Sequence, residues 1–253
     1  MPRVARRKSI SGIYHVILRG INKQTIFEDD EDKGRFLETL KKYKELCNYQ
    51  LYSYCLMDNH IHLLMRESDE SISNVIKRIS SSYVYWYNLK YDRCGHLFQE
   101  RFKSENVETK TYFMNVLRYI HQNPLKAGLT RNVFESKWTS LNEYFGNINI
   151  VDTDLGLKQF SPDKETAITL FNHFMTEHNE DQCLEYKIIA RKSDDEVREE
   201  LEKLGIPSTS VLQALERKSR DEALGRLKEL SGISVRQLSR ITGISRSVIQ
   251  RIQ

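Results

Sequence analysis

A short polar turn between two strand-like segments constrains the fold of this chain most strongly. Tyr49–Leu56 and His60–Met65 are rich in apolar and aromatic residues, and only Met57-Asp58-Asn59 separates them. Asp and Asn favour tight turns because their short polar side chains bond to the nearby backbone. The pattern therefore predicts an antiparallel β-hairpin.

The hairpin lies within a longer alternation of strand and helix signals. A strand is predicted at Ile13–Arg19 and a strand pair or bent strand at Leu97–Val107. Apolar residues at helical spacing predict helices at Glu31–Cys47, Ser71–Lys90 and Thr109–Asn123. The last of these should end near Asn123, because Pro124 disfavours helical geometry in the residue before it. This order predicts an α+β fold, a ferredoxin-like antiparallel sheet with helices on one face.

The 253 residues are enough for one large domain or for a medium domain with a smaller second domain. We expect the first domain to span residues 1–150 and an acidic helical connection to follow at 151–190. Residues 191–253 are expected to form an all-α region. Helical spacing after residue 150 is found at Glu165–His178, Ser193–Leu204 and Ser208–Arg217.

The C-terminal residues 234–253 have the pattern of a helix-turn-helix. Two short helices, Ser234–Ile241 and Ser245–Ile252, each begin with Ser at the expected N-cap, and Gly243 lies in the turn between them. The second helix would offer three side chains to a DNA major groove, those of Arg246, Gln250 and Arg251. An ordinary helical hairpin is the alternative, but the glycine in the turn and the absence of acids after Ser231 favour DNA binding.

Charge and cysteine usage limit the classes of protein that fit. The net charge is only +4, but basic residues gather near both ends, which fits either a partner rich in phosphate or a solvated basic face. The four cysteines have no paired spacing, so neither a disulfide framework nor a zinc knuckle is indicated. No apolar run is long enough to span a bilayer, and Met1–Ile10 lacks the apolar centre of a signal peptide. A cytoplasmic protein with no membrane partner is therefore expected.

His60 and His62 are two residues apart in a predicted strand, so both imidazoles point to the same face. The pair could bind one divalent metal ion, although histidines at this spacing also occur by chance on solvent-facing strands. Imidazole suits zinc, manganese, nickel or cobalt. Magnesium prefers oxygen and would need an additional oxygen ligand and water.

Tyr119 lies at the edge of the apolar stripe of the helix Thr109–Asn123, and Asn123 follows one turn later on the same face. A tyrosine in this position is commonly a core aromatic with a wet hydroxyl. Its phenol, with an ordinary pKa of about 10, is a poor nucleophile at neutral pH. A metal ion on a scissile phosphate could lower that barrier.

Four short motifs follow one another in order between about residues 10 and 145. They are Tyr14–Gly20 (YHVILRG), Met57–Leu64 (MDNHIHLL), Phe98–Ser104 (FQERFKS) and Arg118–Pro124 (RYIHQNP). Together they resemble the IS200-like single-tyrosine transposases, and most closely the REP-associated branch. The sequence departs from the common pattern at Asp58, where a proline is frequent.

The resemblance implies a metal-dependent single-stranded DNA transposase and endonuclease that acts beside hairpins. His60 and His62 would hold a divalent metal, Mg or Mn, and Asn123 would complete its ligands. Tyr119 would attack the scissile phosphate, leaving a 5′-phosphotyrosine link and a free 3′-hydroxyl that could later rejoin the strand. The alternatives are a non-catalytic DNA-binding regulator derived from a transposase and a metal-dependent phosphodiesterase that uses water rather than tyrosine.

Polar and basic residues near the motifs are candidates for binding the DNA strand. They are Arg19, Asn22, Arg101, Lys103 and Arg118, and ordinary surface charge is an equal alternative for each of them. The helix-turn-helix would add a contact with duplex DNA. Small members of the family exchange helices between subunits whereas the REP-associated members resemble monomers, so a monomer and a homodimer both remain open.

Overall fold

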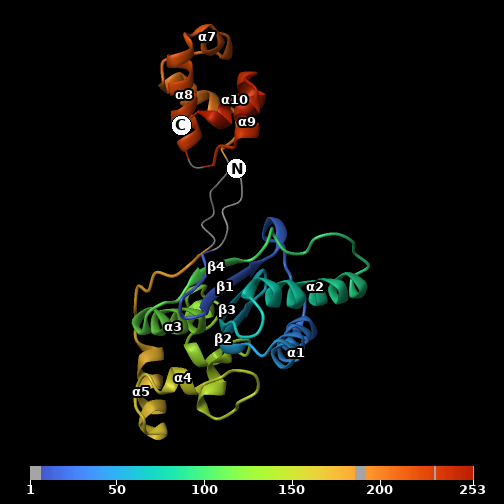
Figure 1. Cartoon of the computed structure of the whole chain (residues 1–253), viewed down its shortest axis with the longest axis vertical. Helices are drawn as coiled ribbons and strands as arrows, with labels where there is room; N and C mark the ends of the chain where they lie inside the picture. The colour runs from blue at the N-terminus through green and yellow to red at the C-terminus, as the bar shows by residue number, and fades with distance from the viewer. Residues whose placement is uncertain (1–6, 186–191, 231, 253) are drawn as a thin grey trace. The chain divides into compact units, whose positions relative to one another are not determined.

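The computed structural model describes residues 7–185, 192–230 and 232–252. The described residues fall into two compact units, one within residues 7–185 and the other within residues 192–252 (Figure 1). No helix in these ranges is both long enough and apolar enough to cross a membrane.

The first unit is built on a four-stranded antiparallel sheet with the strand order β2-β3-β1-β4. The strands are β1 (Ile13–Arg19), β2 (Gln50–Met57), β3 (His60–Arg66) and β4 (Lys103–Asn106). Helices α1 (Asp30–Cys47) and α2 (Ile72–Lys90) connect them in the order β1-α1-β2-β3-α2-β4. Strands β2 and β3 form the hairpin, with Met57 paired to His60. This is the ferredoxin-like arrangement that the sequence predicts.

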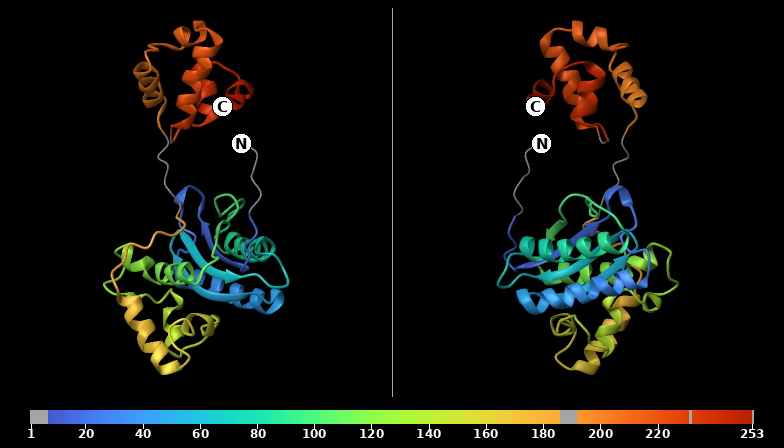
Figure 2. Two further views of the ribbon diagram at one scale, coloured as in Figure 1. Left: turned by 60° about the vertical axis from the view of Figure 1, so that its left-hand side comes forward. Right: turned by 90° about the vertical axis from the view of Figure 1, so that its right-hand side faces the viewer.

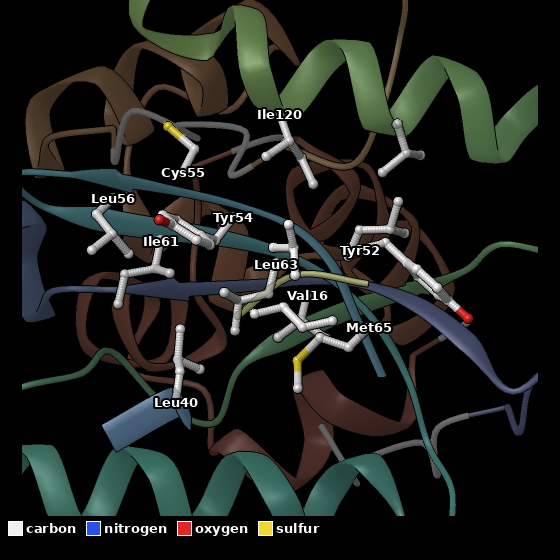
Figure 3. Close-up of a cluster of buried hydrophobic side chains, with 14 of the residues drawn as sticks. Val16, Leu40, Tyr52, Tyr54, Cys55, Leu56, Ile61, Leu63, Met65 and Ile120 are labelled. Atoms are coloured by element: carbon white, nitrogen blue, oxygen red, sulfur yellow. The ribbon is translucent and has the colours of Figure 1, made fainter. Parts of the chain in front are cut away.

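Helices cover both faces of the sheet. Helices α1 and α2 lie side by side on one face (Figure 2), and α3 (Lys110–Lys126) lies on the other. In the close-up of the core, Leu40 of α1 approaches the sheet from one side and Ile120 of α3 from the other (Figure 3). The predicted layer of helices on one face is formed by α1 and α2, whereas α3, predicted at Thr109–Asn123, covers the opposite face (Figure 3). Almost every residue of β2 and β3 is buried, so the second face also needs a covering layer.

Helix α3 continues through Pro124 to Lys126, so the prediction that it ends near Asn123 was wrong. Proline removes one backbone donor, but the following amides still close the last turn. The amide of Ala127 donates to the carbonyl of Asn123 and that of Leu129 donates to the carbonyl of Pro124, both at 3.0 Å.

The segment predicted as a strand pair or bent strand at Leu97–Val107 is strand only over β4. Before β4, Phe98 forms an isolated bridge with Gly20. Between Phe98 and β4, Glu100 adopts a left-handed conformation with φ of 57°, which interrupts the extended chain. Arg101 therefore lies outside the strand that contains Lys103, and no strand alternation relates their side chains.

The first compact unit extends to residue 185, past the expected domain end near residue 150. Helix α5 (Lys164–Thr176) follows the short helix α4 (Asp154–Leu157), and its Phe171 and Met175 are fully buried. The ring of Phe171 stacks on that of Tyr144, with centroids 4.5 Å apart. Apolar side chains of α5 therefore complete the core of this unit. The remaining helices of the unit are the 3₁₀ helices Ile21–Lys23, Val133–Glu135 and Ser140–Phe145.

The second unit is all-α, as predicted, and has its own core around Leu224, Leu238 and Ile249. Its helices are α6 (Asp194–Lys203), α7 (Thr209–Ala214), α8 (Arg217–Glu229), α9 (Val235–Thr242) and α10 (Arg246–Arg251). Helix α8 was not predicted. Helix α9 ends at Gly243, which has φ of 71° and whose added Cβ would lie 2.7 Å from the Gln213 side-chain nitrogen. The left-handed conformation of this turn favours glycine.

A buried carboxylate holds the segment between the 3₁₀ helix Ser140–Phe145 and α4. Glu143 is only 5% exposed, and its Oε2 accepts the backbone N–H groups of Asn149, Ile150 and Val151 at 2.7, 2.7 and 3.0 Å. Ile150 and Val151 are themselves buried. The carboxylate thus satisfies backbone donors that could not easily bond to water.

Replacing Glu143 with Ala should lower the free energy of unfolding by about 3 kcal/mol, because the change leaves buried backbone donors without an acceptor. Urea denaturation measures the loss. Glu38→Ala removes a carboxylate on the exposed side of α1 and should change stability by less than about 1 kcal/mol. Equal small effects of the two substitutions would show that Glu143 does not hold this segment.

Candidate active site

Strand β3 places His60 and His62 on the sheet face that α3 covers. Their ring centroids are 5.0 Å apart. On the neighbouring strand β1, Arg19 is paired with His60 and Ile17 with His62. The structure therefore brings the two predicted histidines together, as the strand alternation requires.

Both imidazoles are suited to bind a metal ion through Nε2. The Nδ1–H of His60 donates to Oδ1 of Asn59 at 2.7 Å, which leaves the Nε2 lone pair available. Burial, followed by the charge of Arg19, lowers the pKa of His60 to about 4. Burial, then His15 and His60, holds the pKa of His62 well below its usual value. Both side chains are thus neutral at pH 7, the state in which imidazole binds metals.

Helix α3 adds Tyr119 and Asn123 to the histidine pair. The ring of Tyr119 lies edge-on to that of His62, with centroids 5.6 Å apart. The side-chain nitrogen of Asn123 lies 3.4 Å from Nε2 of His62. The same amide also interacts with His60 and with the hydroxyl of Tyr119. Asn123 is therefore the point on which the two imidazoles and the phenol converge.

A third histidine, His15 of β1, lies directly behind the pair. It is fully buried, and its Nε2 is 3.0 Å from Nδ1 of His62. Its ring also lies edge-on to Tyr119, with centroids 5.9 Å apart. Burial lowers the pKa of His15 to about 3, so it is neutral. We did not single out His15 from the sequence, although strand alternation places it on the same face as Arg19.

An acidic segment after α5, residues 177–185, lies along α3. The hydroxyl of Tyr119 donates to a carboxylate oxygen of Glu185 at 3.0 Å. The guanidinium of Arg118 donates to Asp181 at 2.8 Å and to Glu177 at 3.1 Å. Burial, and then Glu185, raise the pKa of the Tyr119 phenol above its usual value. Residues far from the tyrosine in sequence thus cover it and disfavour its ionised form.

The other candidates for strand binding lie at different places. Lys103 of β4 is paired with Ile17, on the sheet face of the histidines, and Arg19 is paired with His60. Asn22, with φ of 50°, and Arg101 are exposed in the loops after β1 and before β4. Arg118 is buried and held by acids, so the structure does not bring it to the histidines.

In the second unit, the three residues predicted to contact a major groove all lie on α10, and all three are exposed. They are Arg246, Gln250 and Arg251. Arg251 donates from Nε to the carbonyl of Ser247 at 3.0 Å. Helix α10 also packs on α9.

The donors at the site fit a divalent metal only with help from other ligands. The described residues contain no group of three or more His, Cys, Asp and Glu side chains placed to hold a metal ion. Two imidazole nitrogens and the amide oxygen of Asn123, with the amide turned so that its oxygen replaces its nitrogen beside His62, would leave positions for phosphate oxygens and water. This mixed set suits manganese better than magnesium, because magnesium prefers oxygen ligands. Asp58 is exposed and pairs with Lys33 at 2.8 Å.

Comparison with known proteins agrees with this architecture. Residues 8–123 match the model of the family described as IS200-like transposases. A solved REP-associated tyrosine transposase bound to a REP hairpin is 15% identical, with a TM-score of 0.52, over 58% of this chain and 87% of that chain. At this identity the likeness establishes the fold alone.

A putative transposase from Deinococcus radiodurans R1 is also 15% identical, with a TM-score of 0.35, over 47% of this chain and 96% of that chain. No curated protein is significantly similar to the chain. The match over residues 8–123 nevertheless contains all four residues of the candidate site. Residues 8–123 therefore form a domain of the IS200-like transposase family.

Proposed function

We propose that this chain is a metal-dependent single-stranded DNA transposase. It cleaves and rejoins a strand beside a hairpin through a 5′-phosphotyrosine intermediate. The observation that carries the proposal is the convergence of Tyr119, His60 and His62 on Asn123 within a domain of this family. A tyrosine that served only the core would need no pair of neutral, similarly directed imidazoles beside it.

The chain's own groups account for the cleavage step. His60 and His62, with the amide oxygen of Asn123, would hold Mg or Mn, whose charge polarises the scissile phosphate when bound. The phenolic oxygen of Tyr119 attacks phosphorus, and the bond from phosphorus to the 3′-oxygen breaks. The proton lost by the phenol ends on the 3′-oxygen that leaves. The reverse reaction consumes the 3′-hydroxyl and restores the tyrosine, so no external energy source is needed.

The surrounding charges support a DNA strand as substrate. Arg19 and Lys103 are on the site's face of the sheet, and Asn22 and Arg101 are exposed in the adjoining loops. A hairpin partner is supported by the solved REP-associated transposase, which is bound to one. Arg118 would reach DNA only if Asp181 and Glu177 release it.

Glu185 must also leave the tyrosine before the proposed attack. Its carboxylate accepts the hydrogen bond of the Tyr119 hydroxyl, where a substrate phosphate would have to approach. Two anions this close in a partly buried site repel each other. The structure thus corresponds to a state in which the nucleophile is covered.

The second unit would add a contact with duplex DNA. Helices α9 and α10, joined through Gly243, are short and packed together, and α10 exposes Arg246, Gln250 and Arg251. A helix presented in this way can enter a major groove. A non-catalytic DNA-binding regulator is the alternative function, and the intact set of Tyr119 and its neighbours favours the enzyme.

The tyrosine is tested by trapping the covalent adduct. Wild-type protein incubated with a labelled single-stranded hairpin substrate from the flanks of its gene and Mn²⁺ should give a protein–DNA adduct on denaturing electrophoresis. Tyr119→Phe should give none, because the phenolic oxygen is absent. Tyr112→Phe removes a hydroxyl elsewhere on α3 and should retain the adduct. Cleavage that survives Tyr119→Phe would assign the attack to water or to another residue, and absence of cleavage by the wild type would favour the regulator.

Glu185→Gln should speed adduct formation several-fold at subsaturating DNA. The change removes a negative charge beside the tyrosine and lowers the pKa of Tyr119 toward its ordinary value. Single-turnover kinetics measure the rate. Glu180→Gln neutralises an exposed acid of the same segment and should leave the rate nearly unchanged. An unchanged rate in Glu185→Gln would mean that the carboxylate does not obstruct the site.

Arg246→Ala should weaken binding of duplex DNA and lower the slope of log affinity against log salt by about 1, because one phosphate contact is lost. Fluorescence anisotropy at several salt concentrations measures both quantities. Arg226→Ala, which removes an exposed arginine of α8 that is paired with Glu222, is the matched control and should change neither. The same affinity and slope for Arg246→Ala and wild type would remove α10 from the proposed interface.

A further inference from the structure

The inner nitrogen of His62 faces another histidine rather than a carboxylate or a backbone carbonyl. Nε2 of His15 lies 3.0 Å from Nδ1 of His62, and both side chains are buried. The β1–β3 pairing creates this contact, since His15 is diagonal to His62 on the same sheet face. The mechanism proposed above gives His15 no part, yet a polar side chain here must have a bonding partner.

The positions of the hydrogen-bonding groups determine which nitrogen of His62 carries the proton. The side-chain nitrogen of Asn123, which can only donate, faces Nε2 of His62 at 3.4 Å. With the amide placed this way, Nε2 presents its lone pair and the proton of the neutral ring is on Nδ1. Metal binding through Nε2 requires the same tautomer. That Nδ1–H can then only donate to Nε2 of His15.

In this arrangement, one nitrogen of His15 is left without a hydrogen-bond partner among the described residues. When its Nε2 accepts, the proton of the neutral His15 ring is on Nδ1, and Nδ1 is this buried nitrogen. In the opposite assignment the Nε2–H of His15 would donate to Nδ1 of His62, but the N–H on Nε2 of His62 would then point at the side-chain nitrogen of Asn123. An unpaired buried N–H is unfavourable, so its retention calls for a role.

We propose that His15 is a positioning residue for the metal site. By accepting the Nδ1–H of His62, it holds that ring in the tautomer whose Nε2 lone pair points toward Asn123 and Tyr119. Asn59 does the same for His60, through its Oδ1. Both imidazoles thus carry their proton on Nδ1, His60 through Asn59 and His62 through His15. The inference rests on the proposed function, in which the two histidines hold a divalent metal, and extends it to a residue that touches neither metal nor DNA.

Two substitutions separate the hydrogen bond from the bulk of the side chain. In His15→Gln the amide end can occupy the position of Nε2 and its oxygen can accept the Nδ1–H. In His15→Asn the shorter amide reaches only as far as Nδ1 and cannot. Calorimetric titration of the metal-free full chain with Mn²⁺ should show a Kd raised about 10- to 100-fold in His15→Asn and largely restored in His15→Gln.

The tautomer itself is read by long-range ¹H–¹⁵N NMR of the metal-free protein. We expect the His62 proton on Nδ1 in wild type and in His15→Gln, and a mixture in His15→Asn. A wild-type proton on Nε2 would overturn the inference even if His15→Asn failed to fold. Equal Kd values for Mn²⁺ in wild type and His15→Asn would also overturn it but would leave the proposed function intact. No Mn²⁺ binding by wild type would instead remove the metal site and the inference with it.

Discussion

The packing of α3 on the β2–β3 face of the sheet is the contact on which the candidate site depends. The imidazoles come from β3 and the phenol and amide from α3, so neither element forms the site alone. The contact is made mainly by apolar groups, among them Ile120 of α3 (Figure 3). Because close-packed interiors resist small shifts, this core holds the polar groups at nearly constant separation. The relative positions of the imidazoles, the phenol and the amide are thus set by the burial of apolar side chains between α3 and the sheet.

Features that depend on local sequence could be predicted. The hairpin follows from its short polar turn, the common face of His60 and His62 from the strand period, and the pairing of Tyr119 with Asn123 from the helix period. Each of these needs only a few consecutive residues. The ferredoxin-like order could be inferred because it follows from the succession of such local elements.

Features that depend on distant pairing could not be predicted in the same way. The contact of His15 with His62 requires the register of β1 against β3, which no single strand specifies. The covering of Tyr119 by Glu185 joins residues far apart in the sequence. The predicted end of α3 near Asn123 was too early. A proline disfavours helical geometry in the residue before it, but the hydrogen bonds that follow Pro124 outweigh this preference.

The stacking of Phe171 on Tyr144 also determines how far the first unit can be truncated from its C-terminal end. The family match ends at residue 123, and most of the sheet and its helices are complete by then. Yet a fragment that stopped at residue 150 would expose the ring of Tyr144 and its apolar surroundings, which α5 buries. Such a newly exposed aromatic surface favours aggregation. A stable fragment of this unit therefore has to extend at least through α5, well past the residues that match the family model.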